Sequence, residues 1–271
     1  MTPGREKGTV PFFRHLCSQG NCMILHIPHS SRSIPAALRG QFVLDDKALE
    51  EERTRVTDAF TDELFAHPDA RRVVFEVSRL VVDVERFSHD RDEPMSRAGQ
   101  GMIYTRTCLG EPLRRALSDE ERRFLKSEYY VRHHELLRRA VLDELLARGK
   151  TLIVDCHSYP SRPLPCDVIR DENRPDFCVG TDAFHTPPAL LQSVESALRG
   201  KGYSVGIDSP YSGTMVPSAY YRKNPDVRSV MIEVNRSLYM DEEAGTKSSG
   251  FESAKDRIQA FLKELAAFGA A

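Results

Sequence analysis

Residues 151–158 read TLIVDCHS, an apolar run that carries an aspartate and stops at a histidine and a serine. The run is short and rich in Val and Ile, which predicts a buried β-strand. Five similar runs occur along the chain: MILHI (23–27), RVVFEV (72–77), LVVDV (80–84), SVGI (204–207) and SVMIEV (229–234). We therefore expect these segments to build a largely buried sheet.

Segments with helical spacing lie between and after these runs. The clearest covers 118–148, where Ser118 is the expected N-cap and Glu121, three residues later, completes a capping box. The others cover about 45–66, 187–200 and 250–271. Strands that alternate with helices predict an α/β sandwich, in which the helices flank the sheet.

The bulk composition suits one globular domain without a charged partner. The chain has 271 residues, of which 40% are hydrophobic, and a formal net charge of -2. No repeat or linker separates two parts, so we expect one domain over 1–271, with residues 1–20 as a peripheral N-terminal segment. The charge gives no reason to expect nucleic acid or a membrane surface as partner. The residues before Met23 hold no apolar run long enough for a signal peptide or a membrane span.

The cysteines are scattered without a C-x-x-C pair, which indicates free thiols and not a disulfide framework. They are Cys17, Cys22, Cys108, Cys156, Cys166 and Cys178. With free thiols and no export signal, the cytoplasm is the expected compartment.

Three of the expected strands run into a polar residue suited to catalysis. MILHI leads to His29, TLIVDC to His157, and SVMI to Glu233. In open α/β sheets, ligands bind beyond the carboxyl ends of the strands, so these three ends can meet in one crevice. Two histidines and a carboxylate suit a catalytic zinc ion, which lowers the pKa of its water towards ~7 while a nearby carboxylate moves the proton.

Each of these residues also has an ordinary structural explanation. A histidine after a strand is often a hydrogen-bonded loop residue, and His26, inside an apolar run, is better explained as a core histidine. Asp155 and Glu233 end apolar runs and are costly to bury unless they are paired or bound to a metal. Nucleophilic chemistry has less support, because Cys156 and His157 are adjacent in a strand and point to opposite faces, and no G-x-S-x-G elbow or phosphate loop occurs.

Seven segments, taken in order, resemble the N-formylglutamate amidohydrolase family: IPHSSRSIP, LVVDVERFSHD, GMIYTRTCLG, DCHSYPSRPLP, GTDAFHTP, SPYSGTMVP and VMIEVNRSLYMDE. The resemblance runs from about Cys22 to Phe261. That family is similar to zinc carboxypeptidases and aspartoacylases. The resemblance therefore implies a three-layer α/β sandwich of the phosphorylase/hydrolase type, with a mixed, largely parallel sheet flanked by helices and a metal at the strand ends.

The resemblance also implies roles for single residues. His29, in IPHSS, matches the first metal-binding histidine, and His157, in DCHS, matches the later one. Glu233, in IEVNR, matches the glutamate that activates water. Arg86, in DVER, matches the arginine that holds a substrate carboxylate, for which a guanidinium offers paired hydrogen bonds.

Two positions depart from the pattern of related zinc enzymes. The zinc carboxypeptidase pattern is H-x-x-E, but Arg32 stands three residues after His29, and an arginine cannot ligate a cation. We take Asp58, in VTDAFTDELF, as the third ligand and Asp62, on the same helical face, as its reserve; a plain helix-surface role is the alternative for both. Glu85 stands where asparagine is usual, and its charge would disfavour a dianionic substrate such as formylglutamate.

Further polar residues of these segments are expected to bind the substrate. They are Arg97, Tyr104 and Arg106, in the long loop 87–112, and His185, Tyr211 and Arg236, in later segments of the resemblance. A solvated side chain or an ion pair is the alternative for the loop arginines, and core packing is the alternative for Tyr104.

The expected function is zinc-dependent hydrolysis of the amide bond of an N-acyl amino acid, most simply N-formyl-L-glutamate to formate and L-glutamate, in amino-acid degradation. One alternative is a carboxypeptidase-like hydrolase of a peptide or cell-wall fragment. Another is a non-catalytic member of the family that binds a metal or a carboxylate. The expected partner is a small acyl amino acid, and a homo-oligomer is left open.

Overall fold

The computed structural model describes residues 23–270, so the expected peripheral segment 1–20 lies outside the described residues. Its centre is a six-stranded sheet with the strand order β2-β1-β3-β6-β4-β5. The strands are β1 (Met23–Ile27), β2 (Arg71–Val74), β3 (Thr151–Tyr159), β4 (Phe177–Gly180), β5 (Val205–Ile207) and β6 (Val227–Asn235). Neighbouring strands are parallel except β4 and β6, which confirms the mixed, largely parallel sheet.

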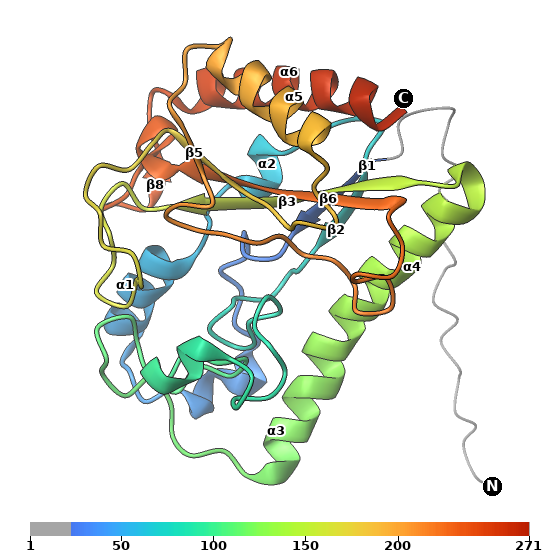
Figure 1. The fold of residues 1–271 in the computed structure, drawn as a ribbon. Coiled ribbons are helices and arrows are strands. Elements are labelled where there is room, and N and C mark those ends of the chain that lie inside the picture. The colour runs from blue at the N-terminus through green and yellow to red at the C-terminus, as the bar shows by residue number, and fades with distance from the viewer. Residues whose placement is uncertain (1–22, 271) are drawn as a thin grey trace, which may run out of the picture.

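Helices cover both faces of this sheet and confirm the three-layer α/β sandwich (Figure 1). The short α2 (Thr61–Leu64), α5 (Pro188–Arg199) and α6 (Phe251–Ala270) pack on one face. The long α4 (Arg132–Arg148) crosses the other face and contacts β1, β2 and β3. The expected helices over 187–200 and 250–271 are therefore confirmed as α5 and α6.

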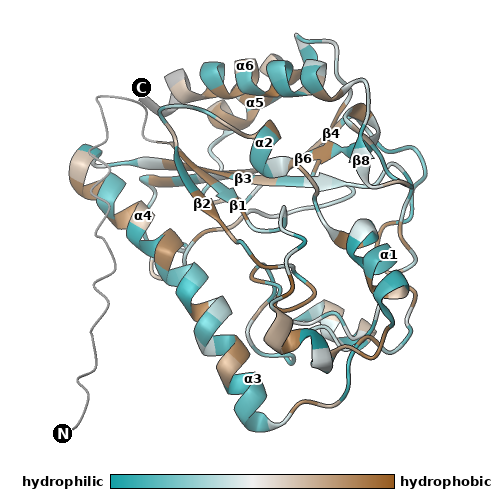
Figure 2. Ribbon diagram, turned by 180° about the vertical axis from the view of Figure 1, so that it is seen from behind, coloured by the Kyte–Doolittle hydropathy of each residue, from teal (hydrophilic) through white to brown (hydrophobic). Residues whose placement is uncertain are grey.

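Successive side chains of β3 point alternately to the two faces of the sheet. Leu152, Val154 and Cys156 point into the core with α5 and α6, while Ile153 packs with residues of α4. Asp155 and His157 lie on the same face as Ile153, because side chains repeat every second residue along a strand. Figure 2 shows hydrophilic and hydrophobic residues alternating along α4.

A second apolar core lies beyond the α4 face and contains no strand of the main sheet. It gathers side chains from α1 (Asp46–Val56), from residues 75–84 and 102–113, and from the end of α3 (Asp119–Leu125). These segments form the lower half of the molecule in Figure 1, with two turns of 3-10 helix at Ala36–Gln41 and Pro94–Ala98. This half carries one wall of the candidate site.

Three of the strand predictions need correction. LVVDV (80–84) is buried but forms turns, because Arg114 donates hydrogen bonds to the carbonyls of Leu80 and Val81 and thereby replaces a neighbouring strand. RVVFEV pairs with β1 only over β2, which also takes in Arg71. No strand was expected at β4, whose four residues lie in a stretch with many Pro, Arg and Asp residues.

The expected helix over 118–148 is confirmed, and the one over 45–66 needs correction. Ser118 and Glu121 form the expected capping box, and α3 continues through a π-helical turn (Lys126–Val131) into α4. The expected helix over 45–66 instead breaks into α1 and α2. At the break, Phe60 takes a left-handed conformation with φ of 66°. No helix of the described residues is both long and apolar enough to cross a membrane.

Candidate active site

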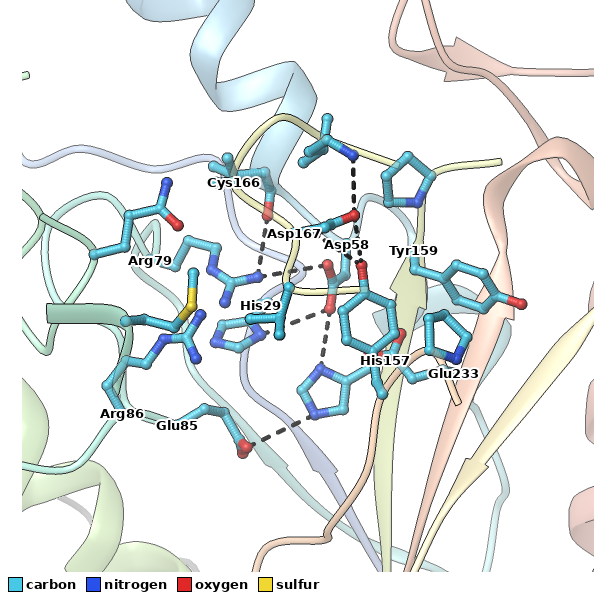
Figure 3. Close-up of a pocket in the computed structure, with 18 of the residues that line it drawn as sticks. His29, Asp58, Arg79, Glu85, Arg86, His157, Tyr159, Cys166, Asp167 and Glu233 are labelled. Carbon is cyan, nitrogen blue, oxygen red and sulfur yellow. Dashed lines mark hydrogen bonds and ion pairs between the residues drawn. The ribbon is translucent and has the colours of Figure 1, made fainter. Parts of the chain in front are cut away.

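A cavity of about 660 Å³ opens at the carboxyl ends of β1, β3 and β6 (Figure 3). These strands are adjacent and parallel, so their ends lie at one edge of the sheet. The cavity is lined by His29, which follows β1, by His157 of β3 and by Glu233 of β6. The expected convergence of the three strand ends is therefore present. Residues within 55–58, 79–104, 158–169 and 210–212 form most of the remaining walls.

The strand register places the polar side chains of the cavity beside one another. His157 is the register partner of Glu233, and Asp155 is the register partner of His26 in the strand on the other side. Neighbouring strands lie about 4.8 Å apart, so paired residues on the same face are within contact distance. Two histidines and two carboxylates thus meet on the α4 side of the sheet.

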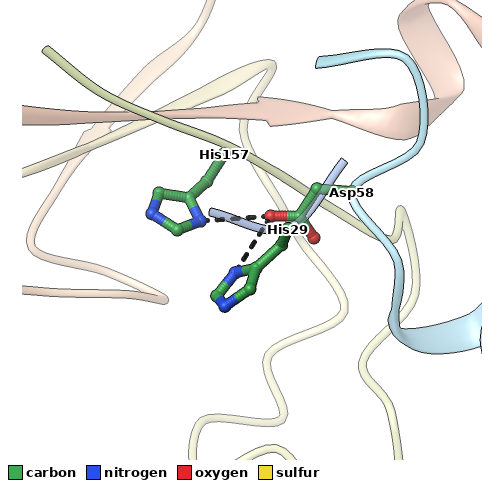
Figure 4. A group of neighbouring side chains, drawn as sticks. All are labelled: His29, Asp58 and His157. Carbon is green, nitrogen blue, oxygen red and sulfur yellow. Dashed lines mark hydrogen bonds and ion pairs between the residues drawn. The ribbon is translucent and has the colours of Figure 1, made fainter. Parts of the chain in front are cut away.

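His29, Asp58 and His157 form a buried cluster whose ligand atoms all lie within 4.8 Å of one another (Figure 4). Nδ1 of His157 lies 3.1 Å from Oδ2 of Asp58, and Nδ1 of His29 lies 3.6 Å from the same oxygen. Ligand atoms about 2.1 Å from a tetrahedral zinc ion stand roughly 3.4 Å apart. The separations in the cluster bracket that value, so these three residues fit a metal ion.

Asp58 reaches the cluster because the first helix breaks in front of it. The backbone N–H of Asp58 donates to the carbonyl of His29 over 3.0 Å, which ties the break to the end of β1. Arg236 donates to Oδ1 of Asp58 over 3.1 Å and to the carbonyl of Arg55 over 2.6 Å. One carboxylate oxygen is therefore held by Arg236, and the other faces the two histidines.

The far nitrogen of each histidine is held by another buried carboxylate. Nε2 of His29 lies 2.9 Å from Asp83, and Nε2 of His157 lies 3.1 Å from Asp155. An ionised carboxylate only accepts hydrogen bonds, so both Nε2 atoms carry their protons and the neutral rings present a lone pair at Nδ1. Such carboxylate–histidine pairs are typical of metal sites. The buried Nδ1 of His29 has no hydrogen-bond partner, as expected of a ligand atom.

The charges around the cluster favour a cation. Burial opposes ionisation of Asp58, but the two histidines that face it, His157 and His29, outweigh burial and lower its pKa. Burial likewise disfavours a charged His157, yet the charge of Asp155 raises the pKa of His157 well above its usual value. A positive charge at the histidines is therefore stabilised by the buried carboxylates, and a bound metal ion would supply it.

Glu233 lines the cavity with a carboxylate oxygen that has no hydrogen-bond partner. Its Oε2 atom is buried without a hydrogen bond. Burial raises the pKa of Glu233 to about 8, a shift that the charge of His157 only partly offsets. A carboxyl group whose pKa lies near neutrality is suited to accept a proton and to return it.

A second group brings His26, Glu85 and Asp155 together beneath the first. Both nitrogens of His26 are engaged, Nδ1 with Asp155 over 2.8 Å and Nε2 with His133 over 2.8 Å. His26 is thus a buried, hydrogen-bonded strand residue, as expected. Burial and the nearby charge of Asp155 raise the pKa of Glu85 well above its usual value.

The comparisons with known proteins agree with this geometry. The family model of N-formylglutamate amidohydrolase matches residues 22–240. The chain belongs to the N-formylglutamate amidohydrolase family. The family is one of amidohydrolases, and the match spans every residue of the cavity lining. A search of the curated proteins finds no match.

Two solved structures share the fold of this family member. An N-formylglutamate amidohydrolase from Ralstonia eutropha JMP134 is 23% identical, with a TM-score of 0.82, and the alignment covers 92% of this chain and 94% of that one. A gene product of Agrobacterium tumefaciens is 20% identical, with a TM-score of 0.64, over 92% of this chain and 89% of that one. At this identity, the likeness concerns the fold.

The structure brings several of the expected substrate-binding residues of this family member to the cavity. Arg86, Tyr104, Tyr211 and Arg236 line it together with the cluster. Tyr104 donates a hydrogen bond to Asp83 over 2.7 Å, so its hydroxyl supports the partner of His29.

Three other expected residues do not reach the cavity. The side chain of Arg106 donates to Gly110 within its own loop, and that of Arg97 is exposed to solvent. His185 is buried elsewhere, with Nδ1 against the carbonyl of Val227 and Nε2 accepting from the N–H of Arg222. None of these three side chains lines the cavity in this structure. The sequence pattern of a loop does not tell which side chains point inward.

The structure explains the departure at Arg32 and identifies the acid that joins the two histidines. Arg32 pairs with Glu50 and donates to Thr54 over 2.9 Å, both on α1, so it lies away from the cavity. Asp58, and not Asp62, joins the two histidines. However, Asp58 lies in the break between two helices, so its expected position on a helix was wrong.

Sequence reasoning missed Asp83 and Arg79. Asp83 is buried and accepts hydrogen bonds from Arg79 over 2.7 Å and from Tyr104, in addition to contacting His29. Its signal was present in LVVDV, since an acid at the end of an apolar run must find partners when it is buried. The same signal identified Asp155.

Proposed function

We propose that this chain is a zinc-dependent amidohydrolase that cleaves the amide bond of an N-acyl amino acid, with N-formyl-L-glutamate as the simplest candidate. The observation that carries the proposal is the buried cluster of His29, Asp58 and His157, in which Nδ1 of His29 has no hydrogen-bond partner. In the same cavity, Glu233 has a carboxylate oxygen without a hydrogen-bond partner. Amide hydrolysis needs these two features, a metal ligand set and a proton carrier.

The metal would be held by His29, Asp58 and His157. A two-histidine, one-carboxylate set is a ligand set of catalytic zinc, and zinc so bound supplies Lewis acidity for the amide carbonyl and the water. Asp83 and Asp155 hold the rings so that Nδ1 of each histidine faces Asp58. Arg236 holds Asp58 itself and is therefore proposed as a positioning residue of the site.

Glu233 would move the proton of the reaction. In the hydrolysis, water adds to the carbonyl carbon and the carbon–nitrogen bond breaks, which yields a carboxylic acid and a free amine. The unpartnered Oε2 of Glu233 accepts a proton from the attacking water and delivers one to the departing nitrogen. Its pKa of about 8 suits both halves of this cycle near neutral pH.

Arg86 would bind the carboxylate of the amino acid. Its guanidinium lines the cavity and donates no side-chain hydrogen bond in the described structure. The nearest carboxylate oxygens belong to Asp83, at 3.6 Å, and Glu93, at 3.8 Å. A guanidinium that donates no hydrogen bond to the protein keeps its donors available for paired hydrogen bonds with a substrate carboxylate, which would orient the amide towards the cluster.

The proposal is tested with the purified full chain, its metal content and a panel of substrates. We expect one zinc ion per chain and turnover of N-acyl amino acids. Glu233→Gln should keep the zinc and lose about 10²–10⁴-fold in kcat. Glu264→Gln, an exposed carboxylate on α6, is the matched control and should leave both unchanged. A fully active Glu233→Gln enzyme would remove Glu233 from this role.

The same panel separates the two alternatives. Cleavage of short peptides in preference to acyl amino acids would indicate a carboxypeptidase-like enzyme. Absence of turnover after zinc loading would indicate a non-catalytic binding protein. The four cysteines of the described part are free thiols, which supports the cytoplasm as the proposed compartment. A small acyl amino acid remains the proposed partner, and a homo-oligomer stays a prediction.

A further inference from the structure

We infer that the preferred substrate carries a single carboxylate and an apolar group, which the open end of the cavity receives; this inference rests on the proposed amidohydrolase function. It departs from N-formylglutamate, which has two carboxylates. Three features of the cavity support it: the number of arginines without a hydrogen bond, the acids that line the cavity, and the apolar side chains at its opening.

The first feature is that most arginines of the cavity wall already bind other groups of the protein. Arg79 is bound to Asp83 by two hydrogen bonds, of 2.7 and 3.2 Å. Arg236 is buried and bound to Asp58 and to the carbonyl of Arg55. Arg55 itself faces Glu52 at 3.3 Å and Glu51 at 3.5 Å. Of the described arginines that line the cavity, Arg86 alone has a guanidinium without a side-chain hydrogen bond.

One free guanidinium binds one carboxylate. The second carboxylate of a dianionic substrate would need another cation, because moving it from water into the cavity is costly without one. The remaining charged groups of the outer wall are acids, Glu93 and Asp167. Their oxygens accept hydrogen bonds from the protein, Glu93 from the N–H groups of Phe87 and Met95, and Asp167 from Arg174. A second substrate carboxylate would therefore meet the negative charges of Glu93 and Asp167, and neither of these acids can donate a hydrogen bond to it when ionised.

The third feature is the mouth of the cavity, formed by Phe87, Val168 and Ile169. All three line the cavity, yet 62%, 84% and 39% of their surface is exposed. Single exposed apolar residues are common, but these three come from two loops distant in sequence and line the same cavity. Covering them with an apolar substituent would gain about 25 cal/mol for each Å² removed from water.

The exposure of this mouth does not come from a loosely held loop. Arg174 donates to the carbonyl of Pro160 over 3.1 Å and to Asp167 over 2.6 Å, which closes the loop at its base. The backbone of Leu164 donates to Asp167 over 2.9 Å. Cys166 packs against the second core, and Figure 3 shows it beside the cavity. Val168 and Ile169 are thus presented at the opening by a braced loop.

The apolar group can belong to either half of an acyl amino acid, and the experiment distinguishes the two. With the carboxylate on Arg86 and the amide at the cluster, the mouth receives an amino-acid side chain or a longer acyl chain. The test measures kcat/KM of the zinc-loaded chain for N-formyl-L-leucine, N-formyl-L-phenylalanine, N-hexanoylglycine, N-formylglycine and N-formyl-L-glutamate. We expect at least one of the three apolar compounds to exceed both others by about tenfold or more.

Variants of the mouth give an independent readout. The double variant Phe87→Ser and Val168→Ser should reduce the ratio of kcat/KM for the best apolar substrate to that for N-formylglycine by about tenfold. The matched control is Leu146→Ser, an equally apolar residue on α4 that is 77% exposed and outside the cavity lining. The control should leave the ratio unchanged. These residues are exposed, so the variants are expected to fold.

Two results would overturn the inference. One is a preference for N-formyl-L-glutamate over the apolar compounds. The other is an unchanged ratio in the double variant. Calorimetric binding of the same compounds to Glu233→Gln separates this failure from that of the proposed function. Affinity that follows the apolar group, without turnover by the unaltered chain, would keep the inference and overturn the hydrolase.

Discussion

The floor of the cavity, formed by His29, Asp58, His157 and Glu233, differs from its mouth in how the chain holds it. The floor residues are buried, and all except Asp58 lie in or shortly after adjacent parallel strands. Further buried carboxylates fix both histidine rings. The mouth residues are exposed and belong to two loops far apart in the sequence. The difference suggests that the floor carries the chemistry of the family and that the mouth sets which substrate is accepted.

A floor built around a metal ion predicts the largest effect. Removal of metal with a chelator should reduce turnover to near the level of the uncatalysed reaction, because the metal would supply the Lewis acidity that polarises the amide and activates the water. Re-addition of zinc should restore turnover in proportion to bound metal, measured by mass spectrometry. Full activity of the metal-free protein would show that the cluster of His29, Asp58 and His157 is only a hydrogen-bonded group.

The carboxylates behind the histidines predict a smaller loss. Asp83→Asn should lower metal affinity about 10–100-fold, because the partner that orients His29 loses its charge. Competition with a chromophoric chelator measures this. The matched control is Asp143→Asn, an exposed carboxylate that pairs with Arg71 at the surface. Equal affinities in both variants would show that Asp83 serves only to bind Arg79.

The difference between floor and mouth also explains which parts of the fold and of the site could be predicted from the sequence. The strands β1, β3 and β6 follow from their apolar runs, and with them the positions of His29, His157 and Glu233. Asp58 depends on a helix break at Phe60, a non-glycine residue with φ of 66°, for which local propensity gives no signal. LVVDV is apolar enough for a strand, but Arg114, about 30 residues further along the chain, satisfies its carbonyls.

The loops were the least predictable part, because their side chains follow no period. Arg97 and Arg106 were expected in the cavity and lie outside it, whereas Val168 and Ile169 line its mouth. The direction of these side chains depends on contacts such as that of Arg174 with Asp167, which join residues within a braced loop. Sequence alone therefore indicates the chemistry of the site better than its specificity.

Arg86 joins the floor to the mouth, and its substitution predicts an intermediate effect. Arg86→Lys should raise KM about tenfold with little change in kcat, since a lysine keeps the charge and loses the paired hydrogen bonds to the carboxylate. Arg106→Lys, on the exposed loop outside the cavity, is the control and should leave KM unchanged. Steady-state kinetics on one acyl amino acid measures both. Equal KM values would assign the carboxylate to another group.

The smallest effect is expected for the free energy of unfolding when a residue of the mouth is changed, and a buried residue near the floor provides the comparison. Ile232→Ala removes a fully buried side chain of β6 next to Glu233 and should lower the free energy of unfolding by about 2–5 kcal/mol. Ile169→Ala, the same substitution in the mouth, should change it by no more than about 0.5 kcal/mol, because the residue lies at the surface. Urea denaturation measures both values. A large loss in Ile169→Ala would mean that the mouth contributes to the fold, and its apolar side chains would then need no substrate to explain them.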